Sequence, residues 1–154
     1  MLPLVHGATL ALFALVVSQP FFYWVALGSA FETLPGPAYA TVRQAINAIM
    51  NRRLLPLYVA TLVSGLVLFA LALAGHRSGL AAGTAGAIAG LVADAILAVR
   101  RNVPINNAMD AWDPANPPAD WTEQRRRWRA AFAIRQVVLA AAFASLLAGT
   151  LAHR

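Results

Sequence analysis

The sequence predicts an all-α integral membrane protein, a four-helix bundle with amphipathic cytoplasmic helical extensions. Its composition is 60% hydrophobic and 12% charged, whereas soluble domains carry about 25% charged residues. The apolar residues are gathered in four long blocks, and the basic residues fall almost entirely between those blocks. These observations exclude an ordinary soluble domain and favour a single transmembrane domain covering residues 1–154.

Each apolar block approaches the roughly 20 residues that a helix needs to cross a hydrocarbon core of about 30 Å. The first block has no basic leader region and is too long for the core of a signal peptide, so we expect it to be retained as a helix. The predicted spans cover residues 3–31, 54–74, 80–99 and 134–151, and the predicted cytoplasmic connections cover residues 32–53 and 100–133.

The arginines predict the orientation. All 12 basic residues are Arg. Nine lie in the two long connections and Arg135 at the entrance of the fourth span, leaving only Arg77 and Arg154 on the other side. The positive-inside rule therefore places both termini outside, as in a protein of the bacterial inner membrane. Membrane lipids account for the net charge of +6, so we expect headgroups rather than nucleic acid as partners.

Prolines mark the expected irregularities in the first two spans. Pro20 lies within the first span, where proline frees a backbone carbonyl that neighbouring groups must satisfy, so we expect a kink there. After the break at residues 35–37, apolar residues recur at helical spacing and predict an amphipathic cytoplasmic helix that leads into the second span. Pro56 is expected to bend the chain where that helix enters the membrane.

The third span carries an acidic residue on a face of small residues. Ala82, Gly86, Gly90 and Asp94 are four apart, a spacing that lets two helix backbones approach closely. A carboxylate within a span costs about 2.5–3.5 kcal/mol on insertion scales, so Asp94 must face protein or water. It is expected either to form a structural bond with an arginine such as Arg135 or Arg101, to act as a proton acceptor or ligand contact, or to be hydrated near the interface.

The stretch "RRNVPINNAMDAWDPANPPADW" at residues 100–121 is unusually polar for this chain. Pro104 disfavours helical backbone before it, so the third helix is expected to end near Asn102. A short amphipathic helix at the membrane face is expected to follow, with Asn102 capping it and Asn106 bonding to nearby backbone. The last long helix should begin at Asp120 or Thr122 after a proline-rich turn.

Aromatic residues form a stripe on that last helix. Trp121, Trp128, Phe132 and Arg135 are separated by seven, four and three residues, which places them on one face. The stripe is expected to form either an interfacial aromatic belt with headgroup-binding arginines, or the aromatic wall of a pocket with Arg135 at its polar end.

Two segments, "NVPINNAMDAWDP…ADWTEQRRRWRAAFAIR" and "FETLPGPAYATVRQAINAIMNRRLLP", resemble the anthrone oxygenase-like family of small four-helix membrane proteins. The resemblance extends over essentially the whole chain. It implies oxygen-dependent oxidation of a hydrophobic aromatic or quinol-like compound without a tightly bound cofactor. The positions that match the family motifs are Asn102, Pro104, Asn106, Trp128 and Arg135, with Gln44 and Asn47 in the second element.

That chemistry defines an expected site. An anthrone loses a benzylic proton to give a delocalised anion that reacts directly with oxygen, so the protein must supply a base, hydrogen-bond donors and a dry apolar slot. The expected base is Asp94, and the expected substrate contacts include stacking on Trp112 or Trp128. The full expected set is Asp94, Asn102, Asn106 and Arg135 for catalysis and Gln44, Asn47, Trp112 and Trp128 for substrate binding.

Other functions remain open from the sequence. A non-catalytic subunit or assembly factor would dock on a larger membrane complex, or on a second copy, through the glycine-rich third span. A transporter would use Asp94 as a proton site. No metal site is expected, although the predicted topology brings His6, His76 and His153 to one membrane face, where copper or zinc would be the candidate ions.

Overall fold

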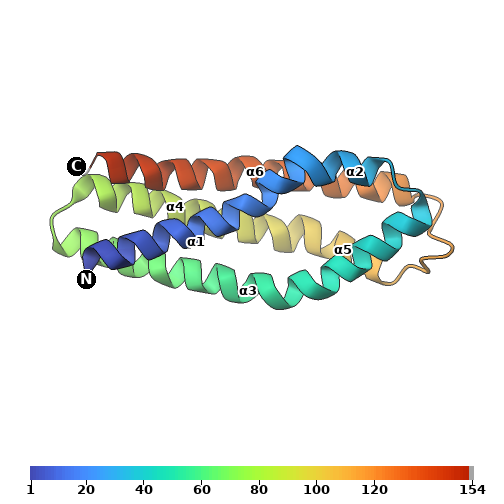
Figure 1. The fold of residues 1–154 in the computed structure, drawn as a ribbon, viewed down its shortest axis with the longest axis horizontal. Helices are drawn as coiled ribbons and strands as arrows, with labels where there is room; N and C mark the ends of the chain where they lie inside the picture. The colour runs from blue at the N-terminus through green and yellow to red at the C-terminus, as the bar shows by residue number, and fades with distance from the viewer. Residues whose placement is uncertain (153–154) are drawn as a thin grey trace.

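The computed structural model describes residues 1–152, except for the side chain of Asn51. Four long helical segments lie side by side and form an all-α bundle (Figure 1), which confirms the predicted fold class. The elements are α1 (Leu2–Phe22), the π-helical turn η1 (Tyr23–Leu27), α2 (Gly28–Glu32), α3 (Gly36–Ala74), α4 (Ser78–Leu97), the π-helical turn η2 (Ala98–Asn102), α5 (Val103–Asp110) and α6 (Trp121–Leu151). Four helices are long and apolar enough to cross a membrane.

The two long connections meet at one end of the bundle. The start of α1 and the end of α6 lie at the left of Figure 1, whereas α2, the start of α3 and α5 lie at the right. We call the right-hand end the motif end, because it holds both recurring sequence motifs. With 39 residues, α3 is about 58 Å long at about 1.5 Å per residue, roughly twice the thickness of a bilayer core. With Arg52–Ala74 as the candidate span, the motif end would extend beyond the hydrocarbon layer of a membrane.

Small residues allow α4 and α6 to pack with their backbones in close contact. A Cβ atom built on Gly83 would lie 2.6 Å from the Cα atom of Gly149, and one built on Gly90 would lie 2.5 Å from the Cβ atom of Ala142. The predicted close approach is thus present, and its partner is the last helix of the same chain. Because α6 covers this glycine-rich face, it is not free to dock on another subunit.

The expected helix end at Pro104 is wrong. The backbone continues from α4 through η2 into α5, and Pro104 is the second residue of α5. Proline lacks an N–H and clashes with the carbonyl four residues earlier in a regular α-helix. The π turn immediately before it changes the hydrogen-bond register, so the chain passes the proline without breaking. Consequently α5 prolongs the third span instead of lying along the membrane face, and Met109 is fully buried.

The first span contains a second π turn. It begins at Tyr23, three residues after Pro20, and the chain changes direction between α1 and α2 (Figure 1). The side-chain Nε2 of Gln136 donates a hydrogen bond of 2.9 Å to the carbonyl oxygen of Pro20. The expected irregularity at Pro20 is therefore present, and a polar side chain from a neighbouring helix bonds the backbone there. Pro56 lies inside α3, which bends part-way along without a break (Figure 1).

Candidate functional site

A buried ion pair joins three helices at the centre of the site. Asp94 on α4 is fully buried, and its Oδ1 accepts a hydrogen bond of 2.8 Å from Nε of Arg135 on α6. Its Oδ2 accepts bonds of 3.1 Å from Nη2 of Arg135 and 2.6 Å from the hydroxyl of Tyr58 on α3. The structure thus shows the structural bond between Asp94 and Arg135 that the sequence offered as one alternative. Both carboxylate oxygens are engaged by these donors.

A stack of cations and rings continues from this pair along α6. The guanidinium carbon of Arg135 lies 5.5 Å from the centre of the Phe132 ring, and Phe132 stacks on Trp128 with centroids 4.8 Å apart. The guanidinium carbon of Arg43, from α3, lies 4.0 Å from the centre of the Trp128 ring. Such contacts stabilise a desolvated cation by about 2 kcal/mol. Only 6% of Trp128 is exposed, so this ring belongs to the interior and not to a belt among lipid headgroups.

Asn106 joins the far end of the stack. Its Oδ1 accepts hydrogen bonds of 2.9 Å from Nη2 of Arg43 and 2.8 Å from Nε1 of Trp128. Asn102 donates from Nδ2 to the backbone carbonyl of Trp128 at 3.1 Å, and it makes no side-chain cap for α5. The expected local roles of both amides are therefore wrong. Each amide bonds instead to other helices, because their positions face the interior once the helix continues through Pro104.

Two further amides fasten the start of α3 to α5 and the connection that follows it. Nε2 of Gln44 donates to the carbonyl oxygens of Met109 at 3.0 Å and Trp112 at 2.9 Å. Nδ2 of Asn47 donates to Oδ1 of Asp110 at 2.9 Å. These bonds tie together the two sequence motifs that lie more than 50 residues apart in the chain.

All eight expected site residues thus lie in one connected set, which we call the polar column. It also includes residues that the sequence reasoning missed, namely Arg43 and Tyr58. In the sequence Arg43 is distinguished only by its positive charge in a connection, although it lies directly before the Gln44 motif position. No sequence pattern marks Tyr58 as part of this set, apart from its position two residues after Pro56. The column runs from Tyr58 and Asp94 through the stack to Asn106 and Asp110.

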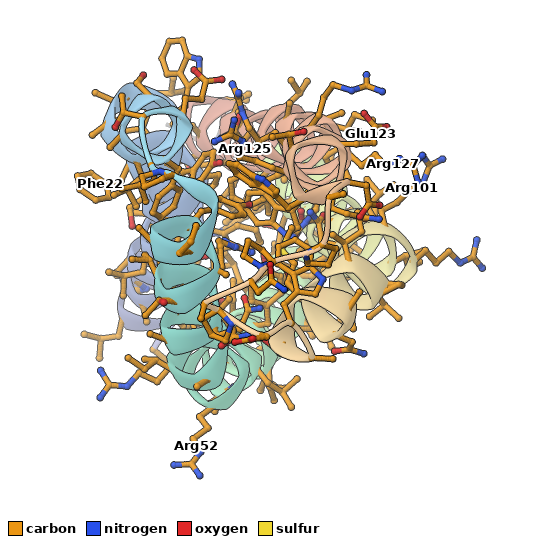
Figure 2. The ribbon with its side chains drawn as sticks, turned by 90° about the vertical axis from the view of Figure 1, so that its right-hand side faces the viewer. Phe22, Arg52, Arg101, Glu123, Arg125 and Arg127 are labelled. Carbon is orange, nitrogen blue, oxygen red and sulfur yellow. The ribbon has the colours of Figure 1, made fainter. Side chains whose placement is uncertain are left out.

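Most other arginines at the motif end point outwards. In Figure 2, which looks onto this end, Arg52, Arg101 and Arg127 extend away from the bundle, whereas Arg125 lies over it between helices. Nη1 of Arg125 donates to the carbonyl oxygen of Phe31 at 3.0 Å, and its guanidinium carbon lies 4.8 Å from the centre of the Trp121 ring. Arg125 therefore closes the bundle against α2.

A cleft lies beside the polar column, between α6 and the first helical segment. Its volume is about 530 Å³. Tyr23 and Phe132 line it and also contact Trp128, with the Tyr23 ring centre 5.4 Å from that of Trp128. The remaining lining residues are Trp24, Gly28, Ser29, Arg126, Arg129, Ala130, Ala133 and Gln136. None of the eight expected site residues lines this cleft. The column reaches the cleft through Phe132 and supports its wall through Trp128.

Tyr23, which lines the cleft, is not among the site residues expected from the sequence. Its ring packs against Phe31, Trp128 and Phe132, and no hydrogen bond to its hydroxyl occurs among residues 1–152. The available signal was its position just after Pro20, where a helix irregularity turns side chains away from their regular direction.

The histidines do not form a visible metal site. Nε2 of His6 lies 2.8 Å from the hydroxyl oxygen of Thr150. No group of three metal-ligating side chains occurs among residues 1–152, and His153, the third expected ligand, lies outside the described residues.

Burial changes the acid–base behaviour of the residues around Arg43. It raises the pKa of Tyr39, on the first turn of α3, to about 12, and it lowers the pKa of Arg43. Since the pKa of Tyr39 is higher in the folded than in the unfolded chain, its contribution to stability is complete below pH 10 and is lost as the pH rises towards 12.

We therefore expect an alkaline loss of stability that Tyr39→Phe reduces. The variant should show a smaller fall in the free energy of unfolding between pH 10 and 12 than the unmodified protein. Chemical unfolding in detergent micelles across this range measures the difference. An identical alkaline slope in the two proteins would contradict the assignment.

Comparison with known proteins finds no match to this chain, whether with family models, curated proteins or solved structures.

Proposed function

We propose that this chain is an anthrone oxygenase-like membrane protein that promotes the oxidation of a hydrophobic aromatic or quinol-like compound by molecular oxygen, without a tightly bound cofactor. The observation that carries the proposal is the cleft between α6 and the first helical segment. Its volume of about 530 Å³ lies within the range of roughly 300–1,000 Å³ found for small-molecule sites. The resemblance of the two motifs to that family supports the same activity.

The lining of the cleft suits a flat, weakly acidic ring system. Tyr23, Trp24 and Phe132 supply aromatic surface. Arg126 and Arg129 also line the cleft, and they form ion pairs with Glu123 and Glu32 respectively. Trp24 is 71% exposed, so the cleft is accessible from the outer surface of the bundle. A hydrophobic compound would enter there from the membrane–water boundary.

The reaction balances without an added reductant. Loss of one benzylic proton to water at the rim leaves an anion spread over the rings, and positive charge beside it stabilises that anion. The anion gives an electron pair to oxygen and forms a carbon–oxygen bond, and protonation yields a hydroperoxide. Loss of water from the hydroperoxide leaves the ketone, so one anthrone and one dioxygen give one anthraquinone and one water.

In this proposal the polar column positions the cleft wall. Asp94 and Arg135 engage each other, and neither lines the cleft. Asn102, Asn106 and Arg43 hold Trp128, against which Tyr23 and Phe132 pack. The residues that touch the substrate are Tyr23, Phe132 and Gln136, with Arg126 and Arg129 at the rim.

Oxygen consumption by purified protein in lipid nanodiscs, supplied with an anthrone, tests the activity. We expect uptake above that of empty nanodiscs, and a reduction on the order of 10²-fold in Tyr23→Phe, which removes a donor from the cleft. Ser18→Ala is the matched control, because Ser18 is exposed on the same helical segment and bonds only to the carbonyl of Leu15. Folded protein that gives no uptake with anthrones or hydroquinones would overturn the proposal, and a stable membrane partner in the same preparation would favour a non-catalytic subunit.

We also propose that the motif end faces the cytoplasm of a bacterial inner membrane, with both termini outside, where its arginines contact anionic lipid headgroups. The chain has no cysteine, so single-cysteine variants report sidedness directly. We expect a membrane-impermeant thiol reagent to label Ser78→Cys in intact spheroplasts and to label Ala115→Cys only in inverted vesicles. The opposite labelling pattern would show that the motif end faces the outside instead.

A further inference from the structure

Two buried polar atoms beside Trp128 have no hydrogen-bond partner in the described part of the chain. They are Nε of Arg43 and Oδ1 of Asn102. Only 4% of Arg43 and 2% of Asn102 is exposed, so bulk water does not satisfy either atom. Buried polar atoms are almost always paired, and each unpaired one calls for an explanation such as an ordered water or a ligand.

The two residues share the same neighbours. The guanidinium of Arg43 lies over the Trp128 ring, while the Nδ2 of Asn102 donates to the Trp128 carbonyl. Asn102 precedes Asn106 by four residues, and Asn106 accepts a bond from Arg43. Residues four apart on a helix are neighbours on its surface. Arg43 from α3 and Asn102 from η2 therefore both contact Trp128 of α6.

We propose that Arg43 and Asn102 bind one buried water molecule between them. Nε of Arg43 carries a hydrogen and only donates, whereas the carbonyl oxygen of Asn102 only accepts. The bound group must accept one hydrogen bond and donate another, as a water molecule does. An anion would have no hydrogen for the Asn102 oxygen, and a metal cation would face the positive charge of Arg43.

The surrounding hydrogen bonds fix the orientation of the pair. Exchanging the amide oxygen and nitrogen of Asn102 would place two carbonyl oxygens against each other at Trp128, because Nδ2 now donates to that backbone oxygen. Nη2 of Arg43 is held by Asn106. The unpaired edges of both side chains are thus set by bonds that do not involve the water.

The water has a positioning role. By engaging Nε of Arg43, it holds the guanidinium over Trp128 and links α3 to η2. Tyr23 and Phe132, which line the cleft, pack against this same Trp128, so the water belongs to the support behind the cleft wall. This inference does not depend on the proposed oxidation.

An experimental structure in nanodiscs, at a resolution that shows ordered water, tests the site. We expect one isolated density peak within hydrogen-bond distance of both Nε of Arg43 and Oδ1 of Asn102. A direct bond between these two atoms, bonds from each to other protein groups, or an empty space between them would overturn the proposal.

A double-variant cycle gives a second, independent measurement of the same site. Each single variant leaves the other polar side chain and the water without one hydrogen-bond partner. Arg43→Met combined with Asn102→Leu removes both side chains that bond to the water. The double variant should lower the melting temperature by less than the sum of the two single variants. Thr84→Val is the control for Arg43→Met, because Thr84, on α4, is buried as Arg43 is but bonds to the Leu80 carbonyl of its own helix. Its effect on the melting temperature should add to that of Arg43→Met. Simple additivity in the Arg43 and Asn102 cycle would count against a shared water.

Discussion

Replacing Arg135 with methionine should destabilise the folded protein by about 3–5 kcal/mol, because it leaves the carboxylate of Asp94 buried without its countercharge. Asp94 is fully buried, and Arg135 supplies two of the three hydrogen bonds that its oxygens accept. Reversible unfolding in mixed micelles, followed by circular dichroism, measures the loss. This is the largest effect we expect from a single side-chain truncation in the bundle.

Two further variants separate the buried charge from the loss of packing. Adding Asp94→Leu to Arg135→Met removes the uncompensated carboxylate, so the double variant should recover much of the lost stability. Glu123→Gln breaks the exposed ion pairs with Arg126 and Arg127 and should change stability little, because exposed pairs contribute little. An Arg135→Met protein as stable as the unmodified protein would show that the pair is not buried in the membrane.

Gly83→Val should cost about 3 kcal/mol or more, because a side chain there must separate two helix backbones. Its Cβ atom would lie 2.6 Å from both the Cα of Gly149 and the carbonyl oxygen of Ser145. Backbone atoms cannot move aside as a flexible side chain can. We expect a lower melting temperature and weaker protection of α4 and α6 amides from hydrogen exchange.

Gly7→Ala provides the matched control on α1. A Cβ atom at Gly7 meets nothing within 4 Å, and alanine favours a helix interior over glycine by about 1 kcal/mol. This variant should therefore be neutral or slightly more stable. If Gly83→Val behaved in the same way, α4 and α6 would not pack as closely as the structure shows.

The four long helices were predictable because apolar blocks of this length favour continuous helix. The predicted block 3–31 corresponds to the helical segment Leu2–Glu32, and 80–99 lies within the segment Ser78–Asp110. The amphipathic stretch and the second span form one helix, Gly36–Ala74. In each case hydrophobic length and helical spacing determine the element.

The helix irregularities were not predictable by the same reasoning. The backbone preferences of proline predict that a helix either continues as α-helix or ends next to Pro104. A π turn is neither of these outcomes. Its formation depends on the packing of η2 against α6, where Asn102 bonds to the Trp128 carbonyl. The expected capping role of Asn102 failed for this reason, since a continuous helix has no free amino end there.

The residues of the polar column were predictable, but their partners only in part. Motif positions such as Asn106 and Trp128 contact each other directly, and the link from Asp94 to Arg135 followed from the cost of a lone carboxylate in a span. The role of Arg43 depends on burial, which charge counting along a loop does not reveal. The cleft depends on the direction of Tyr23 after the π turn, and no local pattern fixes that direction.

The two π turns make chain length a determinant of the site. Each residue of an α-helix advances by about 100° around the axis, and a π turn accommodates one residue more than an α-helix over the same stretch. Deleting one residue from Ala98–Asn102 would therefore let this turn close as regular α-helix, and Pro104 would then clash with the carbonyl four residues before it. With Pro104 in place the chain must keep the extra residue of this turn, so relatives that share the proline should be aligned by preserving the number of residues between Asp94 and Asn106.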